Sequence, residues 1–75
     1  LMNLGATEHE RGRYAESERF FRQALEISTS YYGADHYRTA GNLTYLGRSL
    51  MLQNRIDEAR EAFERALAIR ERVFG

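Results

Sequence analysis

The stretch that decides the fold is residues 43–75, LTYLGRSLMLQNRIDEAREAFERALAIRERVFG. It is a second copy of residues 1–33, LMNLGATEHERGRYAESERFFRQALEISTSYYG, at an interval of 42 residues. Ten of the 33 aligned positions are identical, and the alignment needs no gap. The identical pairs are Leu1/Leu43, Leu4/Leu46, Gly5/Gly47, Arg13/Arg55, Glu16/Glu58, Phe21/Phe63, Ala24/Ala66, Leu25/Leu67, Ile27/Ile69 and Gly33/Gly75. A period of this length is typical of stacked-repeat proteins rather than of compact enzyme domains. The repeat therefore favours a binding scaffold as the functional class.

Apolar residues at helical spacing predict an all-α chain of four helices over residues 1–11, 14–32, 36–53 and 56–74. Gly12, Gly33 and the pair Asn54-Arg55 are predicted to separate them, and Asp35 is predicted to cap the third helix. No segment alternates with a period of two, so no strand is expected. Because the predicted turns are short, neighbouring helices should run antiparallel.

Glycine recurs inside the first and third predicted helices, at Gly5 and Gly47, where it costs about 1 kcal/mol relative to alanine. Its recurrence at the same phase indicates a close approach of the neighbouring helix, with Phe21 and Phe63 filling the adjacent space. The predicted buried stripes are Tyr14, Ser17, Phe20, Phe21, Ala24, Leu25, Ile27, Ser28 and Tyr31; Ala40, Leu43, Leu46, Gly47 and Leu50, with Met51 as a further candidate; and Ile56, Ala59, Phe63, Ala66, Leu67, Ile69, Arg70 and Val73. The exposed faces are predicted to carry the ion pairs Glu18–Arg22, Glu61–Arg65 and Arg60–Glu64.

The composition restricts the class of protein. The 75 residues include 11 arginines, no lysine, 11 acidic residues and no cysteine, so the net charge is zero and no disulfide can form. A neutral chain without a basic face is not expected to bind nucleic acid or an anionic membrane. No apolar run approaches a membrane span and no signal peptide is visible, so a cytoplasmic location is expected.

Residues that could support chemistry are few. Glu8-His9-Glu10 are consecutive, and on a helix they point in different directions, so they cannot converge on one metal ion. His36 beside Asp35 is expected to order a helix start rather than to hold a metal. With two histidines, no cysteine and no phosphate-binding glycine loop, the sequence predicts no catalytic residues, no metal and no cofactor, and therefore no enzyme.

Several of these residues resemble the tetratricopeptide repeat (TPR) signature. They are Leu4-Gly5, Ser17, Phe21 and Ala24 in the first copy, and Leu46-Gly47, Leu50, Ala59, Phe63 and Ala66 in the second. The 42-residue spacing and Gly33-Ala34-Asp35-His36 resemble the kinesin light chain subtype, although Leu1 and Leu43 replace the usual aromatic and Tyr37 the usual proline. The resemblance implies two repeats, residues 1–33 and 34–75, the first without the start of its first helix.

The resemblance also implies a short right-handed superhelix whose first helices line a concave groove for a peptide or a partner helix. Carried over by position, the groove-facing candidates are Met2, Asn3, Ala6, His9, Gly41, Thr44, Tyr45, Arg48 and Met51. Ala6 and Arg48 stand where some members carry residues of a carboxylate clamp, and Arg48 could hold an acidic group through its bidentate fork.

The tyrosines and the last residues lead to two further expectations. Tyr31 and Tyr37 are expected to pack between the repeats, while Tyr45 is equally consistent with packing and with a partner-binding rim. A repeat stack generally needs at least about three repeats and polar end caps. Val73 and Phe74 are therefore expected to contact another copy of the chain or a neighbouring repeat.

Two functional hypotheses remain at this point. The first is a protein–protein interaction scaffold, either part of a longer array or self-associating, that binds a protein or peptide. The second is a sensing segment of a larger regulator, which an adjoining DNA-binding, nucleotidase or kinase domain would favour.

Overall fold

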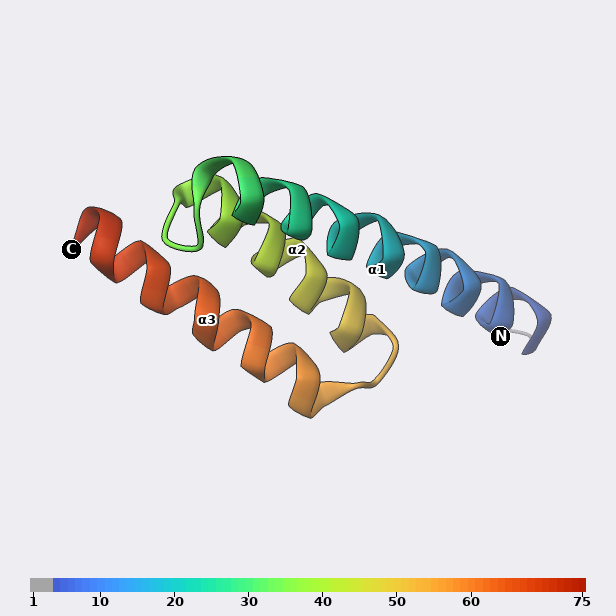
Figure 1. Ribbon diagram of the computed structural model, residues 1–75. Helices are drawn as coiled ribbons and strands as arrows, with labels where there is room; N and C mark the ends of the chain where they lie inside the picture. Colours follow the sequence, from blue (N-terminus) through green and yellow to red (C-terminus); the bar gives the residue numbers. More distant parts are fainter. Residues whose placement is uncertain (1–3) are drawn as a thin grey trace.

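The computed structural model describes the backbone of residues 4–75 and the side chains of residues 12–75. It contains three helices, α1 (Leu4–Tyr32), α2 (Tyr37–Leu52) and α3 (Ile56–Phe74). The helix α2 lies between the other two and packs against both (Figure 1). Residues 4–75 contain no strand, which confirms the all-α prediction.

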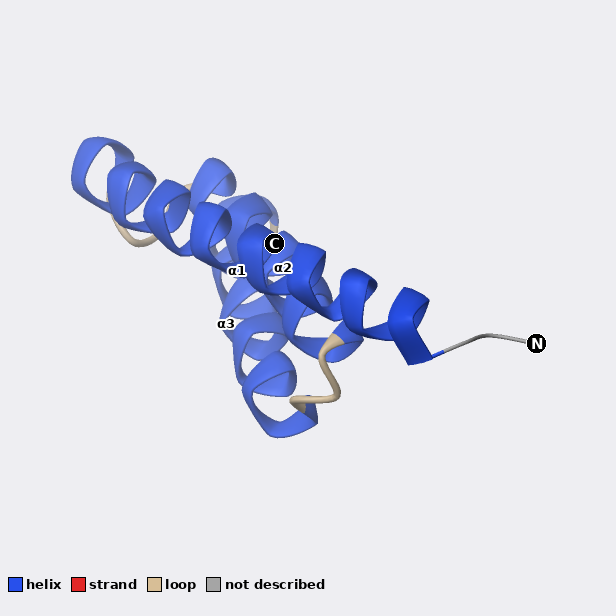
Figure 2. Cartoon of the chain, turned by 90° about the vertical axis from the view of Figure 1, so that its right-hand side faces the viewer, coloured by secondary structure: helices blue, strands red, loops and turns tan. Residues whose placement is uncertain are grey.

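The predicted break at Gly12, and with it the count of four helices, is wrong. Helix α1 runs through Gly12 without interruption, and its N-terminal turns project beyond α2 and α3 (Figures 1 and 2). A single glycine lowers helix stability by about 1 kcal/mol relative to alanine, which the helix formers around it can offset. A Cβ built on Gly12 would meet no atom within 4 Å, so no packed neighbour forces a turn there.

The end of α1 forms as predicted, whereas the start of α2 is capped by a different residue. Gly33 ends α1 in the left-handed region, at φ 97°, and donates its N–H to the carbonyl of Thr29 at 3.0 Å, as predicted. The cap of α2 is His36 rather than Asp35, because the His36 Nδ1 accepts the backbone N–H of Arg38 at 3.1 Å. Asp35 instead accepts Nη1 of Arg72 at 3.0 Å, which ties this turn to the end of α3.

The turn predicted at Asn54-Arg55 forms between α2 and α3. It passes through Asn54 at φ 63°, a left-handed conformation that asparagine tolerates better than most residues. Asn54 is the counterpart of Gly12 at the 42-residue interval. The same repeat position is therefore a turn in the second copy and helical in the first.

The core lies between α2 and α3. Its buried apolar residues are Ala40, Leu43, Leu46, Leu50, Ala59, Ala62, Ala66 and Ile69, and seven of the eight lie on the predicted stripes, Ala62 being the exception. Alanines on α3 let the two helices approach closely, and leucines on α2 fill the space between them. A Cβ on Gly47 would lie 2.7 Å from Cε1 of Phe63, so the helix contact requires glycine there, as the repeat indicated.

Other predicted core positions are exposed. Ile56, Leu67 and Val73 on α3 and Phe20, Ile27 and Tyr31 on α1 are all at least 41% exposed. The predicted stripes were too broad because each assumed a closely packed helix on both flanks, whereas within residues 4–75 the close backbone contacts of α1 and of α3 are made with α2.

Candidate functional site

A groove with a volume of about 490 Å³ runs between α1 and α2. We call it the α1–α2 groove. It is lined by Ala24, Ile27, Ser28 and Tyr32 of α1 and by Tyr37, Arg38, Gly41, Asn42 and Tyr45 of α2. Its lining combines small residues with the rings of Tyr32, Tyr37 and Tyr45.

Small residues and one amide make the floor of the groove. Gly41 leaves open space, since a Cβ there would meet no atom within 4 Å. The Nδ2 of Asn42 donates to the carbonyl oxygen of Ala24 at 3.2 Å and to Oγ of Ser28 at 3.1 Å. Ser28 in turn donates to the carbonyl of Leu25 at 3.1 Å. The floor is therefore rigid, and the polar groups that form it are already hydrogen-bonded within the chain.

Stacked rings form the wall at the α1–α2 turn. His36 lies between Tyr32 and Tyr37, with ring centroids 4.5 Å apart on each side. The guanidinium of Arg38 lies 5.4 Å from the Tyr32 centroid and 5.6 Å from that of Tyr37, within the range of a cation–π contact. This wall offers flat apolar surface beside one fixed positive charge.

A second set of rings includes Tyr45, the groove residue farthest along α2 from the α1–α2 turn. Phe21 of α1 stacks on Tyr45 of α2 at 5.2 Å with 16° between the ring planes, and Phe20 meets Phe21 edge-on at 5.1 Å. Tyr45 is half exposed and Phe20 is 64% exposed. Aromatic side chains that are held in place and still exposed are typical of binding hot spots.

The face of α1 beside the groove is also apolar. Ile27 is 68% exposed and Tyr31 is 79% exposed, and together with Phe20 they continue the apolar lining out of the groove. Large clustered apolar side chains on a surface usually mark a contact with another protein or a ligand. We call Phe20, Ala24, Ile27 and Tyr31 the open face of α1.

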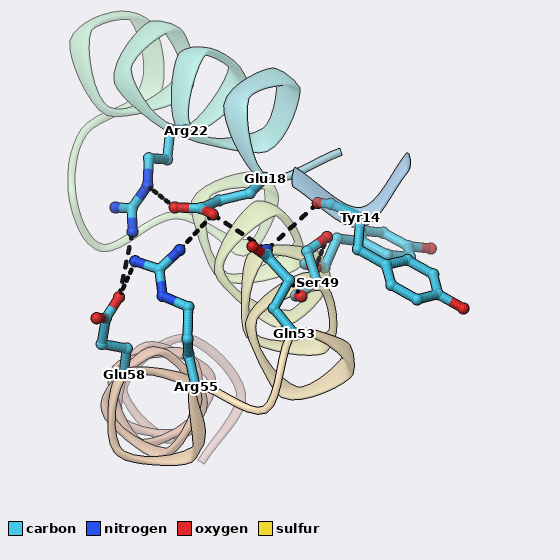
Figure 3. Close-up of polar contacts among 8 residues, drawn as sticks. Tyr14, Glu18, Arg22, Ser49, Gln53, Arg55 and Glu58 are labelled. Carbon is cyan, nitrogen blue, oxygen red and sulfur yellow. Dashed lines mark hydrogen bonds and ion pairs between the residues drawn. The ribbon is translucent and has the colours of Figure 1, made fainter. Parts of the chain in front are cut away.

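A charged network fixes α1 against the α2–α3 turn and so holds the groove in shape (Figure 3). Oε2 of Glu18 accepts Nε of Arg22 at 2.7 Å, and its Oε1 accepts Nη1 of Arg55 at 2.6 Å and Nε2 of Gln53 at 3.1 Å. Arg55 also pairs with Glu58, which lies 3.7 Å from Nη2 of Arg22.

Glu18 is the centre of this network, with a side chain only 12% exposed. Burial by itself would raise the pKa of the Glu18 carboxyl. The hydrogen bonds from Arg22 and Gln53 and the charges of Arg55 and Arg22 outweigh burial, so the pKa lies below its ordinary value. The carboxylate is therefore a structural anion. Of the predicted ion pairs, Glu18–Arg22 is confirmed, and neither Glu61–Arg65 nor Arg60–Glu64 comes within 4.0 Å.

The structure separates the residues predicted to line a concave face. Tyr45 borders the α1–α2 groove and Arg48 is exposed on α2. Thr44 is turned toward α3, where it accepts Nη2 of Arg70 at 3.1 Å. Met51 is half exposed beside Ile56 and Phe63 on the other flank of α2. Met2, Asn3 and the side chains of Ala6 and His9 lie outside the described residues.

The other predicted interface residues and tyrosines are exposed. Val73 is 41% and Phe74 is 73% exposed at the end of α3. The expectation that Tyr31 packs between the repeats is wrong, since it contacts Tyr32 by its edge and is otherwise open to solvent. Tyr37 is half exposed and takes part in the ring wall.

Of the nine residues that line the groove, only Gly41 and Tyr45 were among the predicted groove-facing residues. Helical spacing had assigned Ala24, Ile27 and Ser28 to a buried stripe, and Tyr32, Tyr37, Arg38 and Asn42 had not been predicted to line a groove. The signal that could have found Arg38 and Asn42 is spacing on α2, since Arg38, Asn42 and Tyr45 lie at i, i+4 and i+7 and share one helix face.

The described residues offer no alternative kind of site. Residues 12–75 hold no cluster of three or more histidine, cysteine, aspartate or glutamate side chains that could bind a metal. No helix within the described residues is long and apolar enough to cross a membrane. The α1–α2 groove is suited to binding, because its exposed groups are rings, aliphatic carbons and one arginine.

The comparison with protein-family models shows to which family the chain belongs. The family model described as tetratricopeptide repeat matches residues 1–72. The chain belongs to the tetratricopeptide repeat family. No curated protein and no solved structure gives a significant match. Tetratricopeptide repeats generally mediate protein–protein interaction and are typically modules without enzymatic activity, which agrees with a site made of rings and aliphatic groups.

Proposed function

We propose that this tetratricopeptide repeat chain is a protein-interaction scaffold that binds an apolar helix or peptide of a partner in the α1–α2 groove. The observation that carries the proposal is the groove itself, with a hydrogen-bonded floor, a ring wall at the α1–α2 turn, the half-exposed Tyr45 and an apolar open face beside it. A partner that places apolar side chains over Ile27 and Tyr45 would remove both from water. Arg38 and Arg48 would favour an acidic residue at the edges of the bound segment.

We also propose the finer assignment of this chain as two repeats, residues 1–33 and 34–75, of the 42-residue kinesin light chain-like subtype. The ten identical positions at the 42-residue interval and the resemblance of Gly33-Ala34-Asp35-His36 to that subtype support it. The concave-face residues Tyr45 and Arg48 belong to this proposal, together with Val73 and Phe74 as a contact with a further repeat or copy.

The test is selection of peptides from a displayed random library on the immobilised chain, followed by fluorescence anisotropy of a selected peptide with the dilute protein. Tyr45→Ala should weaken binding about tenfold or more, because a held aromatic side chain in a groove is a hot spot. Leu67→Ala is the matched control, since Leu67 is an equally exposed apolar residue on α3, and it should leave the affinity unchanged. Equal loss in both variants, or no selected peptide, would contradict the proposal.

A further inference from the structure

The side of α1 that packs on α2 has a counterpart on α3. On α1 this side consists of half-buried residues at i, i+4, i+7 and i+11, which are Tyr14, Glu18, Phe21 and Leu25. At the 42-residue interval the corresponding residues are Ile56, Arg60, Phe63 and Leu67. We call these four residues the outer face of α3.

The outer face of α3 is open to solvent, unlike its counterpart on α1. Leu67 is 57% exposed, Ile56 is 44% exposed, and Arg60 is exposed as well. A hollow of about 320 Å³ lies on this face, and its lining is completed by Met51 and Glu64. Apolar side chains clustered around a hollow indicate a contact surface for another molecule.

The packing of α2 on α1 shows how such a face is covered. Tyr45 of α2 stacks on Phe21 with ring centroids 5.2 Å apart, and Phe21 also packs against the buried core. Helix α2 runs back along α1 (Figure 1), so its C-terminal end and the following turn lie at Glu18. A helix that covers α3 in the same way would place an aromatic ring on Phe63 and its C-terminal end at Arg60.

The charge at this end is reversed between the two faces. Glu18 accepts Nη1 of Arg55 at 2.6 Å and Nε2 of Gln53 at 3.1 Å, both from the residues that follow α2. Its counterpart Arg60 can only donate hydrogen bonds and is always charged. Within residues 12–75 no carboxylate lies within 4.0 Å of the Arg60 guanidinium. A helix on the outer face must therefore end in a carboxylate, since one with the charges of α2 would bring an arginine to Arg60.

The next charged residue along the face is reversed as well. Arg22, one turn after Glu18, corresponds to Glu64, one turn after Arg60. Because Glu64 lines the hollow, it would repel an acidic side chain placed beside it. The outer face therefore favours one acid at the C-terminal end of the bound helix over a helix that is acidic along its length.

We propose that the outer face of α3 binds an amphipathic helix of a different protein. The bound helix runs antiparallel to α3 and covers Ile56 and Leu67 with apolar side chains. It stacks an aromatic ring on Phe63, and a carboxylate near its C-terminal end pairs with Arg60. The charge reversal argues against a helix with the sequence of α2, and so against a second copy of the chain, as the occupant. This surface lies on the other flank of α2 from the α1–α2 groove, so the inference goes beyond the proposed function.

Two synthetic peptides test the charge requirement by fluorescence anisotropy with the full chain. One has the sequence of residues 37–55, and the other carries Gln53→Glu and Arg55→Glu in that sequence. The acidic peptide should bind about fivefold more tightly, because only its carboxylates can pair with Arg60. In the Arg60→Glu chain the order of the two affinities should reverse. Equal affinities for the wild-type chain, an order that Arg60→Glu does not reverse, or no binding of the acidic peptide would overturn the proposal.

Variants of the chain identify the surface. Leu67→Ala removes apolar contact from the outer face and should weaken binding of the acidic peptide about tenfold. Tyr45→Ala in the chain is the matched control, because Tyr45 is a similarly exposed residue of the α1–α2 groove, and it should leave this affinity unchanged. Circular dichroism should show an unchanged helical signal in the Arg60 and Leu67 variants, since both side chains are exposed. A loss with Tyr45→Ala and none with Leu67→Ala would overturn the proposal.

Light scattering of the wild-type chain alone distinguishes a different protein from a second copy as the occupant. A monomer that binds the acidic peptide supports the proposal. Self-association that Leu67→Ala abolishes would make a second copy the occupant of the outer face and would overturn the proposal.

Discussion

The two copies of the repeat carry the same packing face and meet different neighbours. On α3 the face ends in Ile69, which is 6% exposed under α2, while on α1 the identical Ile27 is 68% exposed. The side chain and the helix register are the same in both places. The difference therefore comes from the helix that packs on this face and from the residue that precedes the helix carrying the face. In the second copy that residue is Asn54, which forms a left-handed turn, and in the first it is Gly12, which is helical.

This comparison shows that a repeat pattern specifies which face must be covered, and that the connection decides which segment covers it. The same apolar surface stabilises the fold in the second copy and is available for binding in the first. Variants at matched positions of the two copies can separate these roles.

The largest difference is expected at the identical isoleucines. Ile69→Ala should lower the free energy of unfolding by about 2–5 kcal/mol, because it removes buried carbons from a packed contact. Ile27→Ala should change it by less than about 0.5 kcal/mol in dilute protein, as expected for an exposed position. Urea unfolding followed by circular dichroism measures both, and equal losses in dilute protein would break the comparison.

The next effect is expected at the helix contact itself. Gly47→Ala should lower the free energy of unfolding by about 1–3 kcal/mol, since the new methyl group would displace the Phe63 ring from the α2–α3 core. Gly41→Ala on the same helix is the control, because it meets open space and should gain about 1 kcal/mol from helix propensity. A stable Gly47→Ala variant in thermal unfolding would show that the close approach is not required.

The charged network at Glu18 should make the junction of the two copies sensitive to acid. Because folding lowers the pKa of Glu18, its stabilisation is present above about pH 4.5 and is lost as the pH falls through the lower folded-state pKa. Glu18→Gln should lose about 1–2 kcal/mol at neutral pH and flatten the pH dependence below pH 4.5. Glu61→Gln, a control at an exposed position outside this network, should change the free energy of unfolding at neutral pH by less than about 0.5 kcal/mol.

The smallest effect is expected at the position where the copies diverge. Gly12→Ala should stabilise the chain by about 0.5–1 kcal/mol, because alanine favours the helical conformation that Gly12 adopts and meets no neighbour. Helix content should rise in circular dichroism. A loss of stability would indicate that Gly12 forms a left-handed turn like Asn54 in solution.

Most of the second copy could be predicted from the sequence, because its apolar periodicity, Gly47 and the alanines of α3 all indicate the same closely packed pair of helices. The first copy could not, since a glycine between helical segments is compatible with a turn and with a helix, and the choice depends on tertiary contacts. Family resemblance predicted Tyr45 on a concave face lined by first helices, whereas finding Asn42 and Arg38 beside Tyr45 in the α1–α2 groove required knowing which face of α2 meets α1.

The central claim is that the same face is covered within the chain in the second copy and open in the first. Thiol labelling of Phe20→Cys and Ala62→Cys, matched positions in a chain that has no other cysteine, tests it most directly. In dilute native protein the Phe20→Cys thiol should react at the rate of a free thiol. Ala62 is only 5% exposed, so the thiol of Ala62→Cys should react only as fast as the protein unfolds. Equal protection of both thiols at the lowest concentration would contradict the account.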